Sequence, residues 1–489
     1  MTGALFAALL LPSLVSAALA LIARPYRRWL GALSGALAVG AVAASVGLAA
    51  RVVAGAHPVW GPGDLLRADA LSALLAVCVA GVAALATLLG PNLDSGASSY
   101  DDRQARLFAI FANLFAFTML VAVTANNVAV MWIAIEATTI TSAMLIPLRV
   151  SKASVEASWK YILIGSVGIA LAFVGTVLAY FDFVSRVGPH ASALLNWTLL
   201  RAAAPVMHPQ VIQLAFVFVA IGYGTKAGLA PMHTWLPDAH SEAPPPVSAM
   251  MSGVLLAVAL YAIVRWKAVA NAAVGASFTD GLLMALGTIS IAVAALSLVI
   301  QRQYKRMLAY SSIEHTGLVC LSLGLGPLGV FAAMLHLVNH SLAKSMMFFL
   351  SGRILDRYRT AELGGVSGLL TVMPATGACF AAGMLALIGM PPFGLFLSKF
   401  AVLRAGFVAG HPWLMATVLG FLVVAFVALI SQLNRMLYGA PPAGVPIGES
   451  RRLGLVPLGL CLAALLMLGL TVPRPVQALL EGIAEITSR

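Results

Sequence analysis

Residues 222–246, GYGTKAGLAPMHTWLPDAHSEAPPP, place a lysine inside an apolar stretch that glycines and prolines interrupt. Pro231 and Pro237 disfavour a continuous α-helix and Gly228 favours a turn, so the stretch predicts a helix that breaks close to Lys226. Backbone groups freed by a break are tolerated at membrane depth only where they face protein or a hydrated cavity. We therefore predict an internal, hydrated site around Lys226.

The composition of the whole chain places this site in a membrane protein. Of 489 residues, 61% are hydrophobic and 9% are charged, whereas an ordinary soluble domain has roughly 25% charged residues. The mean hydropathy is +0.98. The apolar excess covers the full length, so we expect neither a soluble domain behind a single anchor nor a cleaved leader. The net charge of +12 favours basic membrane loops over nucleic-acid binding, because no basic run alternates with aromatic residues.

Apolar stretches of about 20 residues, the length needed to cross a bilayer, predict an all-α polytopic membrane protein. We count fourteen of them. They lie near residues 3–23, 30–50, 70–90, 107–125, 126–148, 160–182, 210–230, 243–265, 278–300, 307–324, 327–352, 377–406, 412–438 and 453–472. We interpret residues 1–489 as a single integral membrane domain.

The Lys and Arg residues orient these spans. Loops after odd-numbered spans hold 17 of them and loops after even-numbered spans hold seven. Cytoplasmic loops carry the positive excess, so the odd loops are predicted to be cytoplasmic and both termini periplasmic, in a bacterial cytoplasmic (inner) membrane. The seven residues of the even loops are Arg51, Arg67, Arg186, Arg201, Arg265, Lys267 and Arg404. Three further cations, Lys226, Lys344 and Lys399, fall inside predicted spans.

Glutamates accompany these lysines. A charge at the bilayer centre costs at least about 2.5 to 3.5 kcal/mol, so a buried one needs a partner, water or a function. Glu136 lies in the middle of MWIAIEATTITSAM (131–144), and Glu314 lies in YSSIEHTG (310–317). Hydroxyl side chains follow Glu136 and could hydrogen-bond to it; they belong to Thr138, Thr139, Thr141 and Ser142. We predict that Glu136 handles protons, with simple pairing to a neighbouring cation as the alternative.

The pairing of an acid with a broken helix occurs twice. In ALIGMPPFGLFLSKF (386–400), two prolines and a glycine precede Lys399 and predict a second break. Glu136 precedes Lys226 by 90 residues, and Glu314 precedes Lys399 by 85. We interpret this as two five-helix repeats, inverted because each holds an odd number of spans and each containing a broken helix. The repeats would occupy residues 107–265 (spans 4–8) and 278–438 (spans 9–13).

One helical face between the two breaks is rich in titratable groups. His336, His340 and Lys344 recur every four residues, which places them on one face about 6 Å apart, and His315 lies on the preceding span. Imidazoles titrate near neutral pH and can donate and accept a proton at once, so this face predicts a proton relay that continues to Lys399. A metal or haem site and passive polar packing are the alternatives, although no carboxylate or thiol cluster completes a ligand set.

The sequence offers no motif for a cofactor. The four cysteines, Cys78, Cys320, Cys379 and Cys461, stand singly in apolar stretches, without a C-x-x-C pair or a Cys/His cluster. No G-x-x-x-x-G-K-[ST] loop and no strand-associated G-x-G-x-x-G occurs. We therefore expect no cofactor, metal or redox-active residue in this chain.

At these motifs the sequence resembles the antiporter-like family, which comprises the large membrane subunits of respiratory complex I, of multisubunit cation/proton antiporters and of membrane-bound hydrogenases. The resemblance covers roughly residues 65–440. It is carried by KAGLAPMHTWLPDAHSEAPPPVSA (226–249), SSIEHTG (311–317), HLVNHSLAKSMMFFLSG (336–352) and MPPFGLFLSKF (390–400). The sequence IEH within SSIEHTG and the sequence SEAPPPVS within 226–249 look most similar to the component F branch of hydrogenase-4-type and formate hydrogenlyase complexes.

The resemblance implies roles for the buried charges. It places Glu136, Lys226 and Lys399 on a proton path. It implies a similar role for His336, His340 and Lys344. Many members have a lysine on the eighth helix where this chain has Ala257, so the central relay is expected to pass through His315 and the eleventh-helix face, or through water alone. The chain ends about 17 residues after its last span, which disfavours the complex I L-type subunit with its long lateral helix.

The leading hypothesis is a proton-translocating membrane subunit of an oxidoreductase complex, without a catalytic site of its own. Its expected partners are other membrane subunits, the lipid bilayer and a cytoplasmic redox arm that resembles a NiFe hydrogenase or complex I. The alternatives are a subunit that couples proton flow to inorganic-carbon uptake with a soluble zinc protein, a cation/proton antiporter subunit, and an inert scaffold. A scaffold would not need Lys226 and Lys399 at membrane depth.

Overall fold

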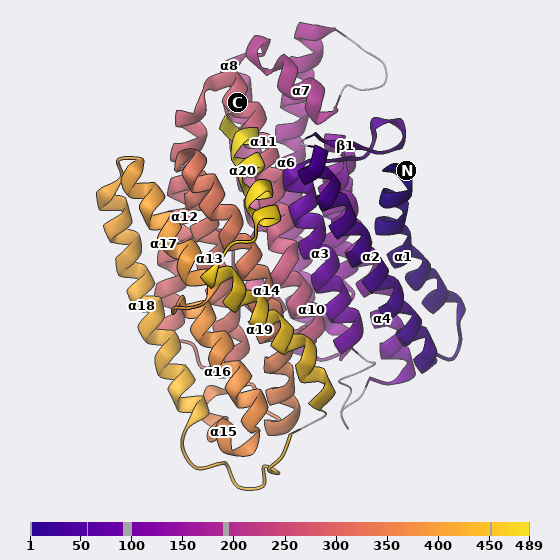
Figure 1. The fold of residues 1–489 in the computed structure, drawn as a ribbon, viewed down its shortest axis with the longest axis vertical. Helices are drawn as coiled ribbons and strands as arrows, with labels where there is room; N and C mark the ends of the chain where they lie inside the picture. The colour runs from indigo at the N-terminus through magenta and orange to yellow at the C-terminus, as the bar shows by residue number, and fades with distance from the viewer. Residues whose placement is uncertain (1, 56, 91–99, 189–194, 450–451, 489) are drawn as a thin grey trace.

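The computed structural model describes residues 2–55, 57–90, 100–188, 195–449 and 452–488. They form a bundle of long helices that run in roughly the same direction, with a small antiparallel hairpin of β1 (Val59–Trp60) and β2 (Arg67–Ala68) near one end (Figure 1). The predicted all-α polytopic class is confirmed.

The helices follow the apolar stretches of the sequence closely. In chain order they are α1 (Thr2–Ile22), α2 (Arg28–Gly55), α3 (Ala70–Leu89), α4 (Asp102–Thr124), α5 (Val128–Ala143), α6 (Lys152–Val187), α7 (Trp197–Ala203), α8 (Pro209–Lys226), α9 (Trp235–Glu242), α10 (Pro245–Met250), α11 (Leu256–Val274), α12 (Ala276–Val299), α13 (Tyr304–Leu323), α14 (Gly326–Tyr358), α15 (Leu369–Val372), α16 (Pro374–Ile388), α17 (Gly394–Val408), α18 (Pro412–Leu437), α19 (Leu455–Leu470) and α20 (Arg474–Ser488).

Each of the fourteen predicted stretches overlaps at least one of these helices. Within the described ranges, nine helices are long and apolar enough to cross a membrane, or ten if the bent pair of α19 and α20 forms one span. The difference arises where a span is broken into short helices or carries polar side chains, as in α8, α13 and α16. The exact number of fourteen spans stays a prediction, and so does their grouping into two repeats.

Both predicted breaks are present. Helix α8 ends at Lys226 and α9 begins at Trp235, while α16 ends at Ile388 and α17 begins at Gly394. Gly228 (φ +74°) and Gly389 (φ +91°) adopt the left-handed conformation within these breaks, which a residue with a Cβ atom disfavours. The two lysines differ in place. Lys226 closes the first half of its broken helix, whereas Lys399 lies in the second half of the other.

Close packing of backbones positions the first break. A Cβ atom on Gly222 of α8 would lie 2.5 Å from the backbone nitrogen of Ala172 and 2.6 Å from the carbonyl oxygen of Gly168, both on α6. Small residues allow such an approach between helices in a membrane. Helix α8 is therefore held directly against α6 just one turn before Lys226.

The centre of the bundle is the segment that contains α10 and α11. The apolar part of residues 245–274, which is long enough to cross a membrane, is entirely buried within the protein. Ala257 lies on α11 and is 4% exposed, so the position at which the resemblance implies a lysine faces packed protein in this chain.

Four cations that the sequence assigned to loops are buried within helices. They are Arg265 and Lys267 of α11, Lys305 of α13 and Arg353 of α14. The interpretation that only Lys226, Lys344 and Lys399 lie inside spans is therefore wrong. Each of the four has polar partners brought by the fold, and Lys267 forms an ion pair with Asp280 at 2.8 Å. Hydropathy along the chain does not reveal such partners, because they come from other helices.

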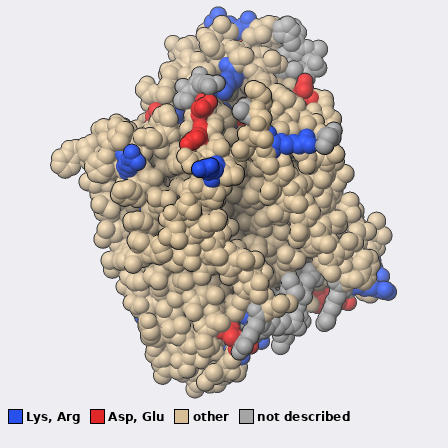
Figure 2. Space-filling view, in the orientation of Figure 1, with Lys and Arg blue, Asp and Glu red and all other residues tan. Residues whose placement is uncertain are grey.

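The outer surface fits a bilayer. Figure 2 shows Lys, Arg, Asp and Glu side chains near the two ends of the visible face, with a broad band free of them between. Large apolar side chains are exposed on the outer helices, among them Leu163, Leu296 and Val427. Exposure of such an apolar surface to water would be unfavourable, so a lipid bilayer is the environment that suits it.

Candidate functional site

The first cluster of buried charge forms around Lys226, whose side chain is almost completely enclosed. Its Nζ atom donates hydrogen bonds to Thr139 Oγ1 of α5 (2.7 Å) and to the hydroxyl group of Tyr161 of α6 (2.7 Å). Thr139 in turn donates to Glu136 Oε2 at 3.2 Å. A continuous line of donors and acceptors therefore connects Lys226 with Glu136.

Tyr161 organises the other side of this cluster. Lys226 Nζ lies 4.7 Å from the centre of its ring, and the ring packs against Trp235 with centroids 4.7 Å apart. Trp235 Nε1 donates to the carbonyl oxygen of Thr225 at 2.9 Å. The two aromatic residues thus hold the break in place, because they join α6 and the start of α9 to the freed backbone at the end of α8.

The second lysine is held differently. Lys399 Nζ forms an ion pair with Glu314 Oε1 at 2.9 Å and donates to the carbonyl oxygen of Ile388 at 3.2 Å. That carbonyl is the last one of α16, which the break leaves without a partner in its own helix. The predicted spacing of Glu314 and Lys399 therefore corresponds to direct contact, while Glu136 and Lys226 are joined through a hydroxyl group.

Three buried histidines lie between these lysines. His315 Nδ1 is 2.9 Å from His336 Nε2, and His336 Nδ1 is 2.9 Å from the hydroxyl group of Ser398, the residue before Lys399. The rings of His315 and His340 have centroids 5.2 Å apart. The predicted histidine face is therefore a compact cluster that reaches the second broken helix.

Lys344 lies on α14, one turn beyond His340. Its Nζ atom donates to the carbonyl oxygen of Leu308 at 2.7 Å and to the hydroxyl group of Ser311. No carboxylate pairs with it among the residues that the structure describes. A cation bound only by neutral oxygens in a buried position is costly, so Lys344 stays a candidate for the predicted proton relay.

His240 is a further candidate that the sequence reasoning missed. It lies on α9, is fully buried, and neither ring nitrogen has a hydrogen-bond partner among the described residues. Its ring contacts that of Phe348 on α14 with centroids 5.3 Å apart. Its position in the quoted stretch 222–246, after the break that follows Lys226, is the signal available in the sequence. Ser398 and Tyr161 were missed as well, because hydroxyl groups are common in membrane spans.

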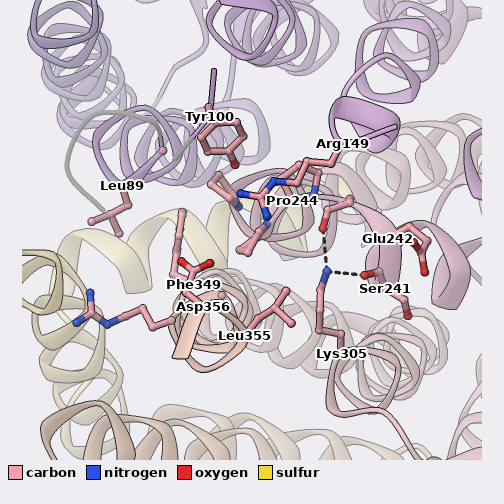
Figure 3. Close-up of a pocket in the computed structure, with 16 residues that line it drawn as sticks. Leu89, Tyr100, Arg149, Ser241, Glu242, Pro244, Lys305, Phe349, Leu355 and Asp356 are labelled. Atoms are coloured by element: carbon pink, nitrogen blue, oxygen red, sulfur yellow. Dashed lines mark hydrogen bonds between the residues drawn. The ribbon is translucent and has the colours of Figure 1, made fainter. Parts of the chain in front are cut away.

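A polar vestibule of about 240 Å³ lies where α3, α9, α10, α13 and α14 meet (Figure 3). Lys305 Nζ points to the backbone there and donates to the carbonyl oxygens of Ser241 (2.5 Å) and Ala243 (2.8 Å), just past His240. Arg149, Glu242 and Asp356 also line the vestibule. Charged groups of both signs can hold water, so this vestibule offers a route from the surface toward α9.

The structure joins the predicted residues into two groups. Glu136 and Lys226 form one, and Glu314, His315, His336, His340 and Lys399 form the other, with Lys344 beside it. No hydrogen bond between described side chains connects the groups. No set of three or more His, Cys, Asp or Glu side chains in the described ranges has a geometry that suits a metal ion.

Comparison with known proteins identifies the family of this chain. Residues 125–424 match the family described as "NADH:quinone oxidoreductase/Mrp antiporter, TM". A hydrogenase-4 component F homolog of Methylacidiphilum infernorum is 42% identical over 326 residues, which cover 66% of this chain and 68% of the relative. Chain 4 of the NAD(P)H-quinone oxidoreductase of Prochlorococcus marinus (strain MIT 9312) is 34% identical over 52% of this chain, which spans about half (48%) of that relative's length.

Solved structures share the fold over nearly the whole chain. A chain of the archaeal membrane-bound sulfane sulfur reductase is 25% identical and superimposes with a TM-score of 0.87, covering 100% of this chain and 97% of that one. A chain of respiratory complex I from Thermus thermophilus is 24% identical, with a TM-score of 0.82 and 99% coverage of both chains. The family match, the 42% identical relative and the buried charges together show that this chain belongs to the NADH:quinone oxidoreductase/Mrp antiporter family, as an antiporter-like multi-pass membrane subunit.

Proposed function

We propose that this chain moves protons across the membrane through its two buried clusters. The observation that carries the proposal is the line of donors and acceptors from the buried Lys226 through Thr139 to the partly buried Glu136, within a membrane protein. Thr139 accepts from the lysine and donates to the carboxylate, so one proton can leave Nζ while another reaches Oε2. The hydroxyl group is restored, and the products are a neutral amine and a neutral carboxylic acid.

The second cluster continues the path. A proton that reaches His336 can pass to His315 or to the hydroxyl group of Ser398, because each ring nitrogen has a partner at hydrogen-bond distance. A positive charge on this cluster repels Lys399 and weakens its ion pair with Glu314. The opening of that pair would release the proton on the far side. Water is proposed to join the two clusters.

A redox reaction in partner subunits is the proposed driving force. The similar proteins include a homolog of hydrogenase-4 component F and a chain of NAD(P)H-quinone oxidoreductase, whose names refer to redox complexes. We propose that this chain packs with other membrane subunits and with a cytoplasmic arm of the NiFe hydrogenase or complex I type, and that the electrons remain in that arm. Its proposed location is the bacterial cytoplasmic membrane, with the basic loops on the cytoplasmic side.

The driver is tested by purification of the complex. The chain is tagged at one terminus, the membranes are solubilised mildly, and the co-purifying subunits and metals are identified by mass spectrometry. Nickel and iron–sulfur subunits, or a quinone-reducing arm, would support a redox-driven pump. A single soluble zinc protein would contradict it and support a role in inorganic-carbon uptake.

Proton movement is tested with the complex in proteoliposomes, where a pH-sensitive acridine dye reports acidification. Lys226→Ala and Glu136→Gln should abolish coupled proton movement while the complex stays assembled on a native gel. Lys152→Ala removes an exposed lysine at the start of α6 and serves as the control. Normal acidification by both site variants would overturn the proposed path, and acidification driven by a sodium gradient alone would favour an antiporter.

A further inference from the structure

A second cavity lies at the opposite end of helix α3 from the vestibule. Leu89, the last residue of α3, lines the vestibule, whereas Arg67, three residues before α3, lines this cavity of about 480 Å³. Its other walls come from α7, α11 and α20, which lie close together in Figure 1. We call it the arginine pocket, because Arg67, Arg201 and Arg265 line it without any Asp or Glu among its lining residues.

Arg67 and Arg265 share one carboxylate. Arg265 binds Asp69 through two hydrogen bonds of 2.5 and 2.6 Å, and Arg67 Nη1 lies 3.0 Å from the same carboxylate. Asp69 stands behind the lining as the N-cap of α3, where its side chain accepts a hydrogen bond from the backbone of Ser72. Its oxygens are therefore occupied, and the group formed by Arg67, Arg265 and Asp69 keeps one positive charge in excess.

Several donors at the pocket have no acceptor. The Nε atoms of Arg67 and Arg265 and the indole Nε1 atom of Trp197 are buried without a hydrogen-bond partner among the described residues. The side chain of Arg265 is only 6% exposed. Buried donors are almost always partnered in native proteins, so a cluster of three indicates a missing acceptor. Guanidinium groups match the geometry of a phosphate, which offers several oxygens at once.

The charge distribution along the sequence points the same way. The loops after even-numbered spans hold only seven Lys and Arg residues, and three of these seven are Arg67, Arg201 and Arg265. Arginine is scarce on that face because positively charged loops favour the cytoplasmic side, so the convergence of three arginines in one pocket indicates a function for their charge. Trp197 and the apolar side chain of Ile486 also line the pocket, a combination typical of the interface between headgroups and acyl chains.

We infer that the arginine pocket binds the phosphate group of an anionic molecule, supplied by a phospholipid headgroup. The arginines would contact the phosphate, and the apolar wall of Ala268 and Ile486 would contact the glycerol and the start of the acyl chains. Such a lipid would join α7, α11 and α20 at one membrane face. This inference is independent of the proposed proton path, because none of the residues of the pocket belongs to that path.

The test measures ligand affinity of the full chain, purified in detergent with its co-purifying subunits and depleted of lipid. Thermal stabilisation is titrated with three probes: dioleoylphosphatidylglycerol, inorganic phosphate, and dioleoylglycerol, which has the acyl chains without the phosphate. Arg201→Gln removes one guanidinium group. Ala202→Phe narrows the pocket from an exposed position of α7 and leaves every charge in place. Arg404→Gln removes an exposed arginine of α17 outside the pocket and is the control.

Phosphatidylglycerol should stabilise the parent chain and the control equally, and dioleoylglycerol should not. Both pocket variants should bind phosphatidylglycerol at least about tenfold more weakly, which corresponds to ~1.4 kcal/mol. Equal affinity of all variants would overturn the pocket as a binding site. If inorganic phosphate stabilises as well as the lipid and depends on Arg201 in the same way, the lipid as the source is overturned in favour of a soluble phosphate.

Discussion

Lys226 and Glu136 share the hydroxyl group of Thr139 and form no ion pair with each other. Thr139 Oγ1 lies 2.7 Å from Lys226 Nζ and 3.2 Å from Glu136 Oε2. A direct ion pair would stabilise the charged forms of both groups. A bridging hydroxyl group stabilises them less and can pass a proton from the lysine to the carboxylate. The second lysine shows the contrasting arrangement, because Lys399 contacts Glu314 directly at 2.9 Å.

Thr139→Val should lower coupled proton movement by about tenfold or more, because valine keeps the shape of threonine and removes the only group between Lys226 and Glu136. Thr139→Ser should restore most of the activity. The control is Thr138→Val on the same helix, since Thr138 donates to the carbonyl oxygen of Ile135 and contacts neither charge. Acidification rates in proteoliposomes decide the matter, and equal rates for both valine variants would contradict the bridge.

Glu314→Gln should destabilise the protein by about 1–3 kcal/mol, because it leaves Lys399, whose side chain is only 12% exposed, without its carboxylate partner. Glu314→Gln combined with Lys399→Met should recover most of the thermal stability and remain inactive in proton movement. Melting temperatures of the two single variants and the double variant form a double-mutant cycle. Additive losses in that cycle would show that the two side chains do not stabilise each other.

His336→Phe should slow proton movement between the clusters, because it keeps an aromatic ring and removes both nitrogens that contact His315 and Ser398. His336→Ala should have a milder effect, since water can enter the space left by the ring. His57→Phe, at an exposed position outside the helices, serves as the control. Stopped-flow acidification separates the variants, and an unchanged rate for His336→Phe would favour passive packing of this face.

Asp69 should make stability depend on pH in the acid range. Burial opposes ionisation of Asp69, but Arg265 and Arg67 outweigh it and hold the pKa of Asp69 well below its usual range. A depressed pKa contributes stability that is fully present above the pKa of the unfolded chain, about 3.9, and is lost as pH falls through the folded value. Asp69→Asn should therefore lower the melting temperature at pH 7, and the difference from the parent chain should shrink below about pH 4. A constant difference from pH 7 to pH 3 would contradict this.

Gly222→Ala should move the first break as a whole. Its Cβ atom would lie 2.5 Å from a backbone atom of α6, so α8 must shift away at a cost of about 1–3 kcal/mol. Lys226 then moves away from Thr139 and Tyr161, and proton movement should fall with stability. Gly420→Ala of α18 is the control, because its Cβ atom would meet nothing within 4 Å. Equal melting temperatures and equal rates in the two variants would show that the close approach is dispensable.

The sequence alone predicts the charged part of the site and much of the fold. Glu136, Lys226 and Lys399 are conspicuous because each stands in an apolar run, and Thr139 was identified near Glu136 by its position on the same helix. Local sequence also predicts both breaks, since proline and glycine act within a few residues.

The remaining contacts depend on other helices and leave no local signal. Tyr161 reaches Lys226 across 65 residues and Ser398 reaches His336 across 62, so neither contact follows from periodicity. Arg265 stands at the last residue of the predicted span 243–265 and is counted there with the following loop, whereas α11 continues to Val274. Asp69, the partner that makes its burial tolerable, lies 196 residues earlier in the chain.

Helix α14 connects the histidine cluster with the surface vestibule. Its 33 residues form one uninterrupted rod, about 50 Å long at 1.5 Å per residue. His336 and Lys344 lie along its length, and Asp356, near its far end, reaches the surface vestibule. Because these groups share one helix, a displacement of its outer end would reach both titratable groups together.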